Sequence, residues 1–406
     1  MSRQASNSPL LFISAGEASG EHYGTQLITA IQQQAATLQL NPAFFGMGGA
    51  RMAAAGCQRI VKSEDVAVMG ITEVITHLPK IYREFRRLKR AIRDQRPDAA
   101  ILIDFPDIHL RLAKEFHRLG IPVLYFVSPQ LWAWKKHRIH EIKKYIDHML
   151  VIFPFEAPFY KSHGVHAEFV GHPLADEPLP AISRDQFAAN HALDPAKHWL
   201  ALLPGSRIKE IHSNLPTILD AAQLLLARRI PAADPLQFIL PIAATLTATQ
   251  RAELRTLIQL HASDLDLRLV IDARAALFHA RASIVASGTA TVEAALMGNP
   301  FVVVYRVSPL TYSIAKRVVK VPHVAMVNLI AQKRLVPELI QHDFTPCNIV
   351  QSLEPLLDDS PARAQMLQGL REFRSLLIPD ALTGLSAISR VAGITLKVAA
   401  SRGANL

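Results

Sequence analysis

The sequence has little of what marks metalloproteins and disulfide-stabilised proteins. Only two cysteines, Cys57 and Cys347, occur among its 406 residues, far apart and without the spacing of a zinc site. This scarcity argues against a disulfide framework and makes a reducing cytosol the natural compartment. The 17 histidines form no HExxH-type ligand pair. We therefore expect no metal ion in this protein.

Long apolar runs are also missing. The longest candidate, Ala282 to Tyr305, contains Glu293 and several glycines, whereas a membrane-spanning helix needs about 20 predominantly apolar residues. Near the N-terminus only Leu10 to Ile13 is apolar, which is too short for the core of a secretory signal. We expect neither a spanning helix nor a signal peptide.

Charged residues are scarce, at 19% of the chain, yet the net charge is +10 because 44 Lys and Arg residues outnumber 34 Asp and Glu residues. Hydrophobic residues make up 50%, which excludes a disordered or coiled-coil chain. A chain that is both apolar and basic suits an anionic partner that also offers apolar contact. Nucleic acid, a membrane surface and a phosphorylated lipid all fit that description.

Two series of short apolar runs, interleaved with helical patterns, follow each other along the chain. Continuous Val, Ile, Leu and Phe runs are typical of parallel strands that helices cover on both faces. The first series comprises Leu10–Ser14, Ala99–Asp104, Ile121–Val127 and His148–Phe153, and the second comprises Trp199–Leu203, Leu236–Leu240, Leu267–Ile271, Ser283–Ala286 and Phe301–Tyr305. This βαβ alternation predicts an α/β fold with open parallel sheets.

The segment His172–Asp185, with three prolines, separates the two series and is interpreted as a linker. We expect two doubly wound, Rossmann-like domains, residues 1–176 and 177–406, with an interdomain cleft. Ligands of such sheets bind at the carboxyl ends of the strands. The last helical segment, Leu385–Ala400, could pack back on the N-terminal domain.

Two motifs follow strands of the first series. SAGEASGE, residues 14–21, joins small residues to a helix start, where backbone N–H groups can bind an anion. A tight turn capped by Ser19 explains the same residues. Asp104 and Asp107 follow the AAILI run, and a carboxylate there could deprotonate a hydroxyl nucleophile. We expect Asp107 to cap the next helix and Asp104 to carry chemistry.

Two further motifs follow strands of the second series. PGSR places Arg207 on a glycine turn, where a guanidinium can bind a phosphate through two parallel hydrogen bonds. SGTATVE, residues 287–293, opens an Ala-rich helix and resembles a diphosphate site. Glu293 lies about one turn into that helix, where it could bind ribose hydroxyls. A solvated arginine and close sheet–helix packing are the structural alternatives.

A basic amphipathic helix is predicted over Pro79–Arg96. Its apolar positions fall on one face, and its basic residues cover much of the remainder. The apolar positions are Ile81, Phe85, Leu88 and Ile92, and the basic ones are Arg83, Arg86, Arg87, Lys89, Arg90 and Arg93. With the apolar segment 66–71, this helix could meet anionic lipid head groups, although a core-packed helix with a solvated face is the usual case. No RNA-binding or helix-turn-helix signature is present.

These segments, taken together and in order, resemble the lipid-A-disaccharide synthase family of inverting glycosyltransferases, which have the two-Rossmann-domain GT-B fold. The resemblance spans roughly residues 10–345. The matching blocks are SAGEASGEHYG, VAVMGITEV, IDFPDIHLRLAK, YFVSPQLWAWKKHRI, FPFEAPFY, FVGHPLADE, LALLPGSRIKEI, ASGTATVEAAL and YRVSPLTYSIAKRVVKVPHVAMVNLIAQKRLVPELIQ.

The resemblance implies a reaction and its partners. The donor would be UDP-2,3-diacylglucosamine and the acceptor 2,3-diacylglucosamine 1-phosphate (lipid X), giving the β-1,6-linked disaccharide 1-phosphate and UDP with inversion. The enzyme would act without cofactor or metal at the cytoplasmic face of the inner membrane, against an anionic membrane surface. Nucleic acid would not be a partner, and a homodimer is left open.

The resemblance also implies roles for single residues. Asp104 would be the general base that takes the proton from the acceptor 6-hydroxyl. Charge that develops on the leaving diphosphate would be stabilised by Arg207 and the helix start after Ser287. The substrate-binding residues implied are Glu17, Ser19, Gly20, Ser206, Arg207, Ser287, Gly288, Thr289, Glu293 and Asn328.

One departure and two alternatives remain at this point. Glu21 stands where the family commonly has aspartate, so we assign it no role. The first alternative is another UDP-sugar enzyme of the GT-B type, such as an epimerase or a peptidoglycan transferase. The second is a non-catalytic basic protein that binds membranes or RNA. The VSPQLWAWKK block argues against the first, and polar motifs at strand ends argue against the second.

Overall fold

The computed structural model describes residues 8–66, 71–133, 136–228, 235–243, 246–308, 312, 321–379 and 384–403, without the side chains of residues 71–78. The chain divides into two compact units. Unit 1 comprises Met1–Asp176 together with Leu377–Leu406, and unit 2 comprises Glu177–Leu376. The boundary falls inside the segment that the prolines marked as a linker.

Unit 1 contains a seven-stranded sheet in the order β3-β2-β1-β4-β5-β6-β7, with every pairing parallel. Its strands are β1 Leu10–Ala15, β2 Ala43–Gly48, β3 Cys57–Lys62, β4 Ala99–Ile103, β5 Val123–Phe126, β6 His148–Val151 and β7 Ala167–Phe169. Its helices are α1 Ala18–Thr37, α2 Ala50–Ala54, α3 Ile71–Gln95, α4 Pro106–Arg118, α5 Ile139–Tyr145, α6 Glu156–Ser162, α7 Pro173–Asp176 and α17 Ala387–Gly403.

Unit 2 repeats this plan with a six-stranded parallel sheet in the order β10-β9-β8-β11-β12-β13. Its strands are β8 His198–Leu203, β9 Leu236–Pro241, β10 Leu267–Val270, β11 Ala282–Ala286, β12 Phe301–Tyr305 and β13 Glu338–Ile340. Its helices are α8 Arg184–His191, α9 Ile208–Arg228, α10 Ala248–Ala262, α11 Ala273–His279, α12 Thr289–Leu296, α14 Met326–Ala331, α15 Pro346–Leu357 and α16 Pro361–Leu376.

Each sheet therefore has a point where the strand order reverses. In unit 1 it lies between β1 and β4, and in unit 2 between β8 and β11. In a doubly wound sheet, the crevice outside the carboxyl ends of these two strands is the usual ligand site. The four motifs predicted to carry chemistry follow these four strands, so the topology collects them at two switch points.

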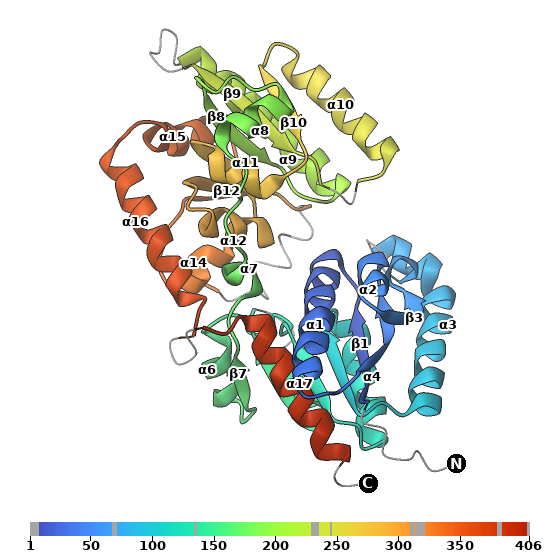
Figure 1. Cartoon of the computed structure of the whole chain (residues 1–406). Coiled ribbons are helices and arrows are strands. Elements are labelled where there is room, and N and C mark those ends of the chain that lie inside the picture. The colour runs from blue at the N-terminus through green and yellow to red at the C-terminus, as the bar shows by residue number, and fades with distance from the viewer. Residues whose placement is uncertain are drawn as a thin grey trace. The chain divides into compact units, whose positions relative to one another are not determined.

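Helix α17 returns the C-terminal part of the chain to unit 1, where it packs beside α1 (Figure 1). The side chain of Gln34 in α1 donates to the carbonyl of Ser389 at 2.8 Å. Asp176 accepts a hydrogen bond from the backbone N–H of Ala387 at 2.6 Å, at the start of α17. These contacts join α17 to α1 and to α7.

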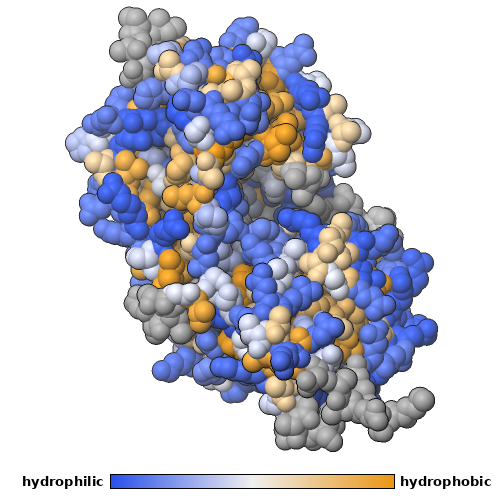
Figure 2. All heavy atoms as spheres, in the orientation of Figure 1, coloured by the Kyte–Doolittle hydropathy of each residue, from blue (hydrophilic) through white to orange (hydrophobic). Residues whose placement is uncertain are grey.

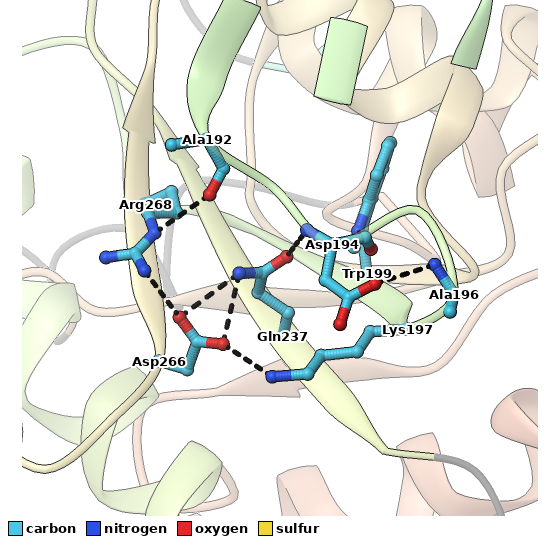
Figure 3. A network of polar contacts seen from close by, with 8 residues as sticks. All are labelled: Ala192, Asp194, Ala196, Lys197, Trp199, Gln237, Asp266 and Arg268. Carbon is cyan, nitrogen blue, oxygen red and sulfur yellow. Dashed lines mark hydrogen bonds and ion pairs between the residues drawn. The ribbon is translucent and has the colours of Figure 1, made fainter. Parts of the chain in front are cut away.

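The amino ends of the unit 2 strands are closed by a polar network (Figure 3). Gln237 in β9 donates to both carboxylate oxygens of Asp266, at 3.1 and 3.0 Å, and accepts from the backbone of Asp194 at 2.9 Å. Lys197 and Arg268 approach the same carboxylate at 2.9 and 3.3 Å. Buried polar groups need such partners. These amino ends lie opposite the carboxyl ends of the strands, where the candidate site is.

Hydrophilic residues cover most of the face of each unit that Figure 2 shows, with small hydrophobic areas between them. The apolar half of the sequence lies mainly in the cores, where strands such as β4 and β11 are buried along their whole length. Among the residues that the structure describes, no helix is long and apolar enough to cross a membrane.

Candidate functional site

The first half of the candidate site lies at the carboxyl ends of β1 and β4 in unit 1. Ala15 of β1 pairs with Ile103 of β4, so the chain segments that follow both strands start side by side. Glu17 is exposed at the N-cap of α1, and Asp104 directly follows β4. The negative charge of Glu17 acts on the carboxyl group of Asp104. Two carboxylates from motifs far apart in the sequence are thus brought together.

Asp104 occupies an unusual backbone conformation. Its φ is +50°, and that of Phe105 is +51°, a left-handed region that costs a non-glycine residue about 1–3 kcal/mol. The N–H of Asp104 donates to the carbonyl of Phe126 at 3.0 Å. Its own carbonyl lies 2.6 Å from the hydroxyl of Tyr125 and 2.6 Å from Nδ1 of His109. The backbone turn is therefore held from both sides.

The carboxyl group of Asp104 is less acidic than an ordinary aspartate. Its pKa is raised to about 6, chiefly by burial and also by the charge of Glu17, while a hydrogen bond from the Phe105 backbone opposes both. A general base works best when its pKa lies near the working pH. At neutral pH, Asp104 is ionised and accepts a proton more readily than an exposed aspartate would.

Glycines set how closely the loop after β1 approaches Asp104. A Cβ at Gly16 would lie 2.4 Å from the ring of Phe105, and one at Gly20 would lie 3.4 Å from the Cβ of Ala15. Gly20 is buried and lets α1 pack on the sheet, while Ser19 is partly buried in the first turn of α1. Gly16 was not singled out from the sequence, although it belongs to the predicted loop.

Two acidic residues near this half-site have structural roles. The carboxylate of Glu21 accepts the backbone N–H of Arg51 at 2.8 Å and so caps α2. Asp107 is exposed in the first turn of α4 and pairs with Arg138. The Glu21 contact satisfies an N–H group at a helix start. The N-cap of α4 is Phe105, so Asp107, which was expected to cap this helix, lies inside its first turn instead. The structure thus gives Glu21 a place outside the candidate site.

The second half of the candidate site lies at the carboxyl ends of β8 and β11 in unit 2, where Leu203 pairs with Val285. The PGSR turn follows β8, and Gly205 has a φ of +127° that favours glycine. The backbone N–H groups of Ser206 and Arg207 donate to the carboxylate of Glu210, at 3.1 and 3.4 Å. Glu210 thus binds the N–H groups that an anion would use.

Arg207 is half exposed, and its guanidinium lies 3.6 Å from the carboxylate of Glu210. Glu210 and Arg207 act with opposite signs on the pKa of Tyr305, which burial raises. The three side chains therefore share one region at the ends of β8 and β12. Glu210 was missed in the sequence because a glutamate in a helical first turn is ordinary.

The fourth predicted motif opens α12. Gly288 is its N-cap, with a φ of +151°, and nothing lies within 4 Å of the place a Cβ would take. Ser287 is partly buried and donates to the carbonyl of Val324 at 3.5 Å, and Thr289 is exposed as the first helical residue. The hydroxyl of Thr291 bonds back to Gly288 at 2.7 Å. The helix start faces open space.

Glu293 and Asn328 have partners within unit 2. Glu293 is half-buried in α12, and its charge opposes the burial that lowers the pKa of Arg274. Asn328 is 0% exposed; its amide donates to the carbonyl of Val336 and to Glu338, at 2.9 and 2.8 Å. Its oxygen accepts two backbone N–H groups, from residues 335 and 336.

Asn328 therefore has its hydrogen-bonding capacity filled by the protein itself. Glu338 also accepts the backbone N–H groups of Val324 and Ala325, at 3.0 and 3.1 Å. These contacts hold the loop before α14 close to Ser287. Asn328 therefore stabilises the loop that lies next to the start of α12. Its direct contact with a nucleotide stays a prediction.

Within the described ranges, no three His, Cys, Asp or Glu side chains gather as they would around a metal ion. What the structure offers is a carboxylate at the end of β4, a guanidinium after β8 and a glycine-containing helix start after β11. Such groups are suited to proton removal and to binding a diphosphate.

The fold resembles enzymes that handle nucleotide sugars. UDP-GlcNAc 2-epimerase from Neisseria meningitidis superposes with a TM-score of 0.58 at 12% identity, covering 96% of this chain and 99% of that one. The calicheamicin glycosyltransferase CalG4 superposes with a TM-score of 0.57 at 17% identity, covering 96% and 98%. At such low identity these similarities show the architecture alone, which is GT-B.

Sequence comparison identifies the family within that class. A family model described as Lipid-A-disaccharide synthetase matches residues 11–381. The lipid-A-disaccharide synthase of Acidobacterium capsulatum is 57% identical over 408 residues, which cover 98% of both chains. The chain belongs to the lipid-A-disaccharide synthase family and is a glycosyltransferase of lipid A biosynthesis.

Proposed function

We propose that this enzyme transfers 2,3-diacylglucosamine from UDP-2,3-diacylglucosamine to the 6-hydroxyl of 2,3-diacylglucosamine 1-phosphate. The products are the β-1,6-linked disaccharide 1-phosphate and UDP. The anomeric centre inverts in one displacement, so no covalent sugar–enzyme species forms. The family membership of the whole chain supports this substrate pair, and the arrangement of Asp104 supports the mechanism.

The observation that carries the mechanism is the ionised, partly buried carboxylate of Asp104 at the switch point of unit 1. It takes the proton as the acceptor oxygen attacks the anomeric carbon. Its pKa of about 6 makes it a stronger base than an exposed aspartate while leaving it ionised at pH 7. Glu17 and Ser19 contribute the neighbouring acceptor-side surface, and the buried Gly20 lets α1 pack close behind them.

The donor is held by unit 2 in this proposal. Arg207 and the N–H groups at the start of α12 stabilise the charge that develops on the diphosphate. Binding the diphosphate at Ser206 and Arg207 displaces Glu210 from their N–H groups. Glu293 binds the ribose, and Asn328 supports this surface through Glu338. The half-exposed guanidinium and the open space beside Gly288 support this assignment.

A transfer assay tests this function directly. Purified enzyme is given both lipid substrates, with a chelator present, and UDP release and the disaccharide 1-phosphate are followed together. We expect both products in equal amounts and no loss of rate with the chelator. UDP release without acceptor-dependent disaccharide would contradict the substrate pair, and loss of activity with the chelator would contradict the metal-free mechanism.

The anionic surface of the inner membrane, on its cytoplasmic face, is the proposed setting. Helix α3 packs Leu88 and Ile92 into the core, as its pattern predicted, and turns its basic face outward. Part of that charge is neutralised inside the protein. Arg83 and Arg87 bind Glu84, and Lys89 and Arg93 bind Glu115. The upstream apolar residues 67–70 lie outside the described residues.

A groove of about 740 Å³ runs along the exposed face of α3 and is lined by Tyr82, Arg86 and Arg90 among others. Replacing Arg86 and Arg90 by glutamine leaves the ion pairs of Glu84 with Arg83 and Arg87 in place. We expect partition onto phosphatidylglycerol vesicles to fall about tenfold or more, since each basic residue near an anionic surface contributes about 1 kcal/mol.

The matched control replaces Arg255 and Arg371, which are exposed on α10 and α16, by glutamine. It changes the net charge equally but should leave partition nearly unaltered. Equal loss in both double variants would mean that total charge, rather than α3, governs binding. Unchanged partition in the α3 variant would mean that the helix serves only the fold.

A further inference from the structure

Three buried polar side chains lie beneath Asp104, and we call Ser14, His109 and Tyr125 the carbonyl clamp. All three are 0% exposed, and they come from β1, α4 and β5. The hydroxyl of Tyr125 donates to the carbonyl oxygen of Asp104 at 2.6 Å, and Nδ1 of His109 lies 2.6 Å from the same oxygen. Side chains from α4 and β5 therefore converge on one carbonyl group, and Ser14 of β1 bonds to His109 behind them.

The direction of each hydrogen bond follows from the chemistry of the groups. A carbonyl oxygen only accepts, so Nδ1 of His109 must carry a hydrogen. Burial lowers the pKa of His109 to about 4, although its bond to the Asp104 backbone opposes this. The ring is therefore neutral at pH 7, and Nε2 accepts the hydroxyl hydrogen of Ser14 at 2.7 Å. The chain of donors runs from Ser14 through His109 to Asp104.

The corresponding strand end of unit 2 shows what the clamp is needed for. There, β11 is followed by Ser287 and then by Gly288, the N-cap of α12, whose φ of +151° suits glycine and needs no special support. In unit 1 a side-chain-bearing residue, Asp104, takes a φ of +50° at the end of β4. A carboxylate can stand at this point only if the backbone is held there by other contacts.

We propose that Ser14, His109 and Tyr125 are positioning residues that hold the main chain of Asp104 in its left-handed conformation and so aim its carboxylate at the acceptor hydroxyl. This proposal rests on the assignment of Asp104 as the general base. The clamp touches no substrate and exchanges no proton in the reaction. It sets the position and the environment of the Asp104 carboxylate.

Among the charged and titratable groups around the carbonyl clamp, Asp104 is the one whose titration reports on the clamp. Tyr125 stays protonated, because burial and then the charge of Asp104 raise its pKa well above the usual value. Tyr160 and Asp107 also raise the pKa of Tyr125, and Arg138 lowers it. Glu17 faces Asp104 from the start of α1. The acidic limb of the rate profile therefore follows the Asp104 carboxyl group.

The test uses variants that remove single hydrogen bonds from the intact enzyme. Tyr125→Phe loses one donor to the Asp104 carbonyl. In His109→Gln the amide nitrogen can reach the Nε2 position but not the Nδ1 position, whereas His109→Asn keeps a donor near Nδ1. Tyr160→Phe is the matched control, since Tyr160 is equally buried and its hydroxyl lies 3.2 Å from Ser128, not from Asp104.

We expect Tyr125→Phe and His109→Gln to lower kcat by about 10- to 100-fold, because a displaced catalytic group loses its oriented approach. The KM for the UDP-sugar should not change, because unit 2 holds the donor. The acidic limb should move from near pH 6 toward the ordinary aspartate value, because a released carboxylate regains water. His109→Asn should restore most of kcat, and Tyr160→Phe should behave like wild type.

Asp104→Asn is assayed alongside to separate this proposal from the one it rests on. If Asp104→Asn keeps its turnover, the base assignment fails. If Asp104→Asn is inactive while folded Tyr125→Phe keeps the wild-type kcat and acidic limb, the clamp is overturned. A 13C titration of the Asp104 carboxyl carbon gives the same answer without activity. An unchanged pKa in folded Tyr125→Phe contradicts the proposal, and a lowered pKa supports it.

Discussion

Asp104 combines two features that oppose folding, a left-handed backbone and a buried negative charge. The first costs about 1–3 kcal/mol for a non-glycine residue. The second appears as a pKa of about 6 in place of 3.8, caused by burial and then by Glu17. Proteins retain such unfavourable residues where the group performs chemistry. The left-handed backbone and the raised pKa thus support the role proposed for Asp104.

This unfavourable burial predicts a pH-dependent gain in stability on replacement by asparagine. The folded pKa of Asp104 lies above the unfolded value, so stability falls as pH rises from about 4 through about 6. Asp104→Asn removes that loss. We expect its thermal midpoint to equal or exceed that of wild type at pH 8 and to show no gain at pH 4. A variant that melts lower at pH 8 would contradict this account.

The sequence predicted candidate site residues that follow apolar strands. It did not predict residues whose contacts with the site form only when the chain folds. Asp104 and Arg207 stand next to strand ends, so their places could be predicted. His109 and Glu210 lie on helices, where nothing in the sequence shows that they reach a strand-end carbonyl or a turn. Asn328 was predicted to bind nucleotide, and its hydrogen bonds within unit 2 became visible only in three dimensions.

The loop between β1 and α1 and the loop between β4 and α4 form a single packed element around Gly16. A Cβ at Gly16 would lie 2.4 Å from the Phe105 ring, and the ring belongs to the residue after the proposed base. Gly16→Ala must therefore push Phe105 aside. We expect kcat to fall by about tenfold or more, since small displacements of a catalytic group are costly.

The matched control for this prediction is Gly393→Ala in α17 of the same unit. A Cβ there would meet only the flexible end of Gln34, at 3.5 Å, and alanine favours a helix. Its activity should equal that of wild type, with the same or greater thermal stability. Equal activity in the two variants would show that the Gly16–Phe105 contact does not position the base.

Elements with continuous apolar runs were predicted from the sequence, and four shorter strands were not. The structure contains the nine predicted strands with ends shifted by up to two residues, as in β5 and β6. It adds β2, β3, β7 and β13. β2 is AFFGMG, with glycines that weaken strand propensity, and the other three lie at or beside sheet edges with polar residues. These edge strands lack the continuous apolar run by which a buried strand is predicted from sequence.

At the scale of the molecule, the same strand order occurs in both units and sets where chemistry can occur. The switch points of the two sheets collect the Asp104 carboxylate in unit 1, and the Arg207 turn and the start of α12 in unit 2. Much of the chain's positive charge is used within the fold, as in the contacts of Lys89, Arg93 and Arg118 with Glu115. The net charge alone does not distinguish positive charge paired within the fold from positive charge at a ligand site.

The chain's two-unit plan was predictable because the strand series restarts after the proline-containing segment. The return of α17 to unit 1 left little trace in the sequence, since a weakly helical segment can pack on either partner. Its contacts, such as Gln34 with Ser389 and Asp176 with Ala387, join residues far apart in the chain. Long-range pairings of this kind are set by the folded surface rather than by local pattern.

The central claim is that Asp104 removes the proton from the acceptor while other residues hold the donor. The direct test compares wild type and Asp104→Asn in single-turnover transfer with both lipid substrates, with UDP affinity measured by calorimetry on the same samples. The account predicts that turnover falls by about 10²- to 10⁴-fold while UDP affinity is nearly unchanged. Near-normal turnover of a folded Asp104→Asn enzyme would contradict it.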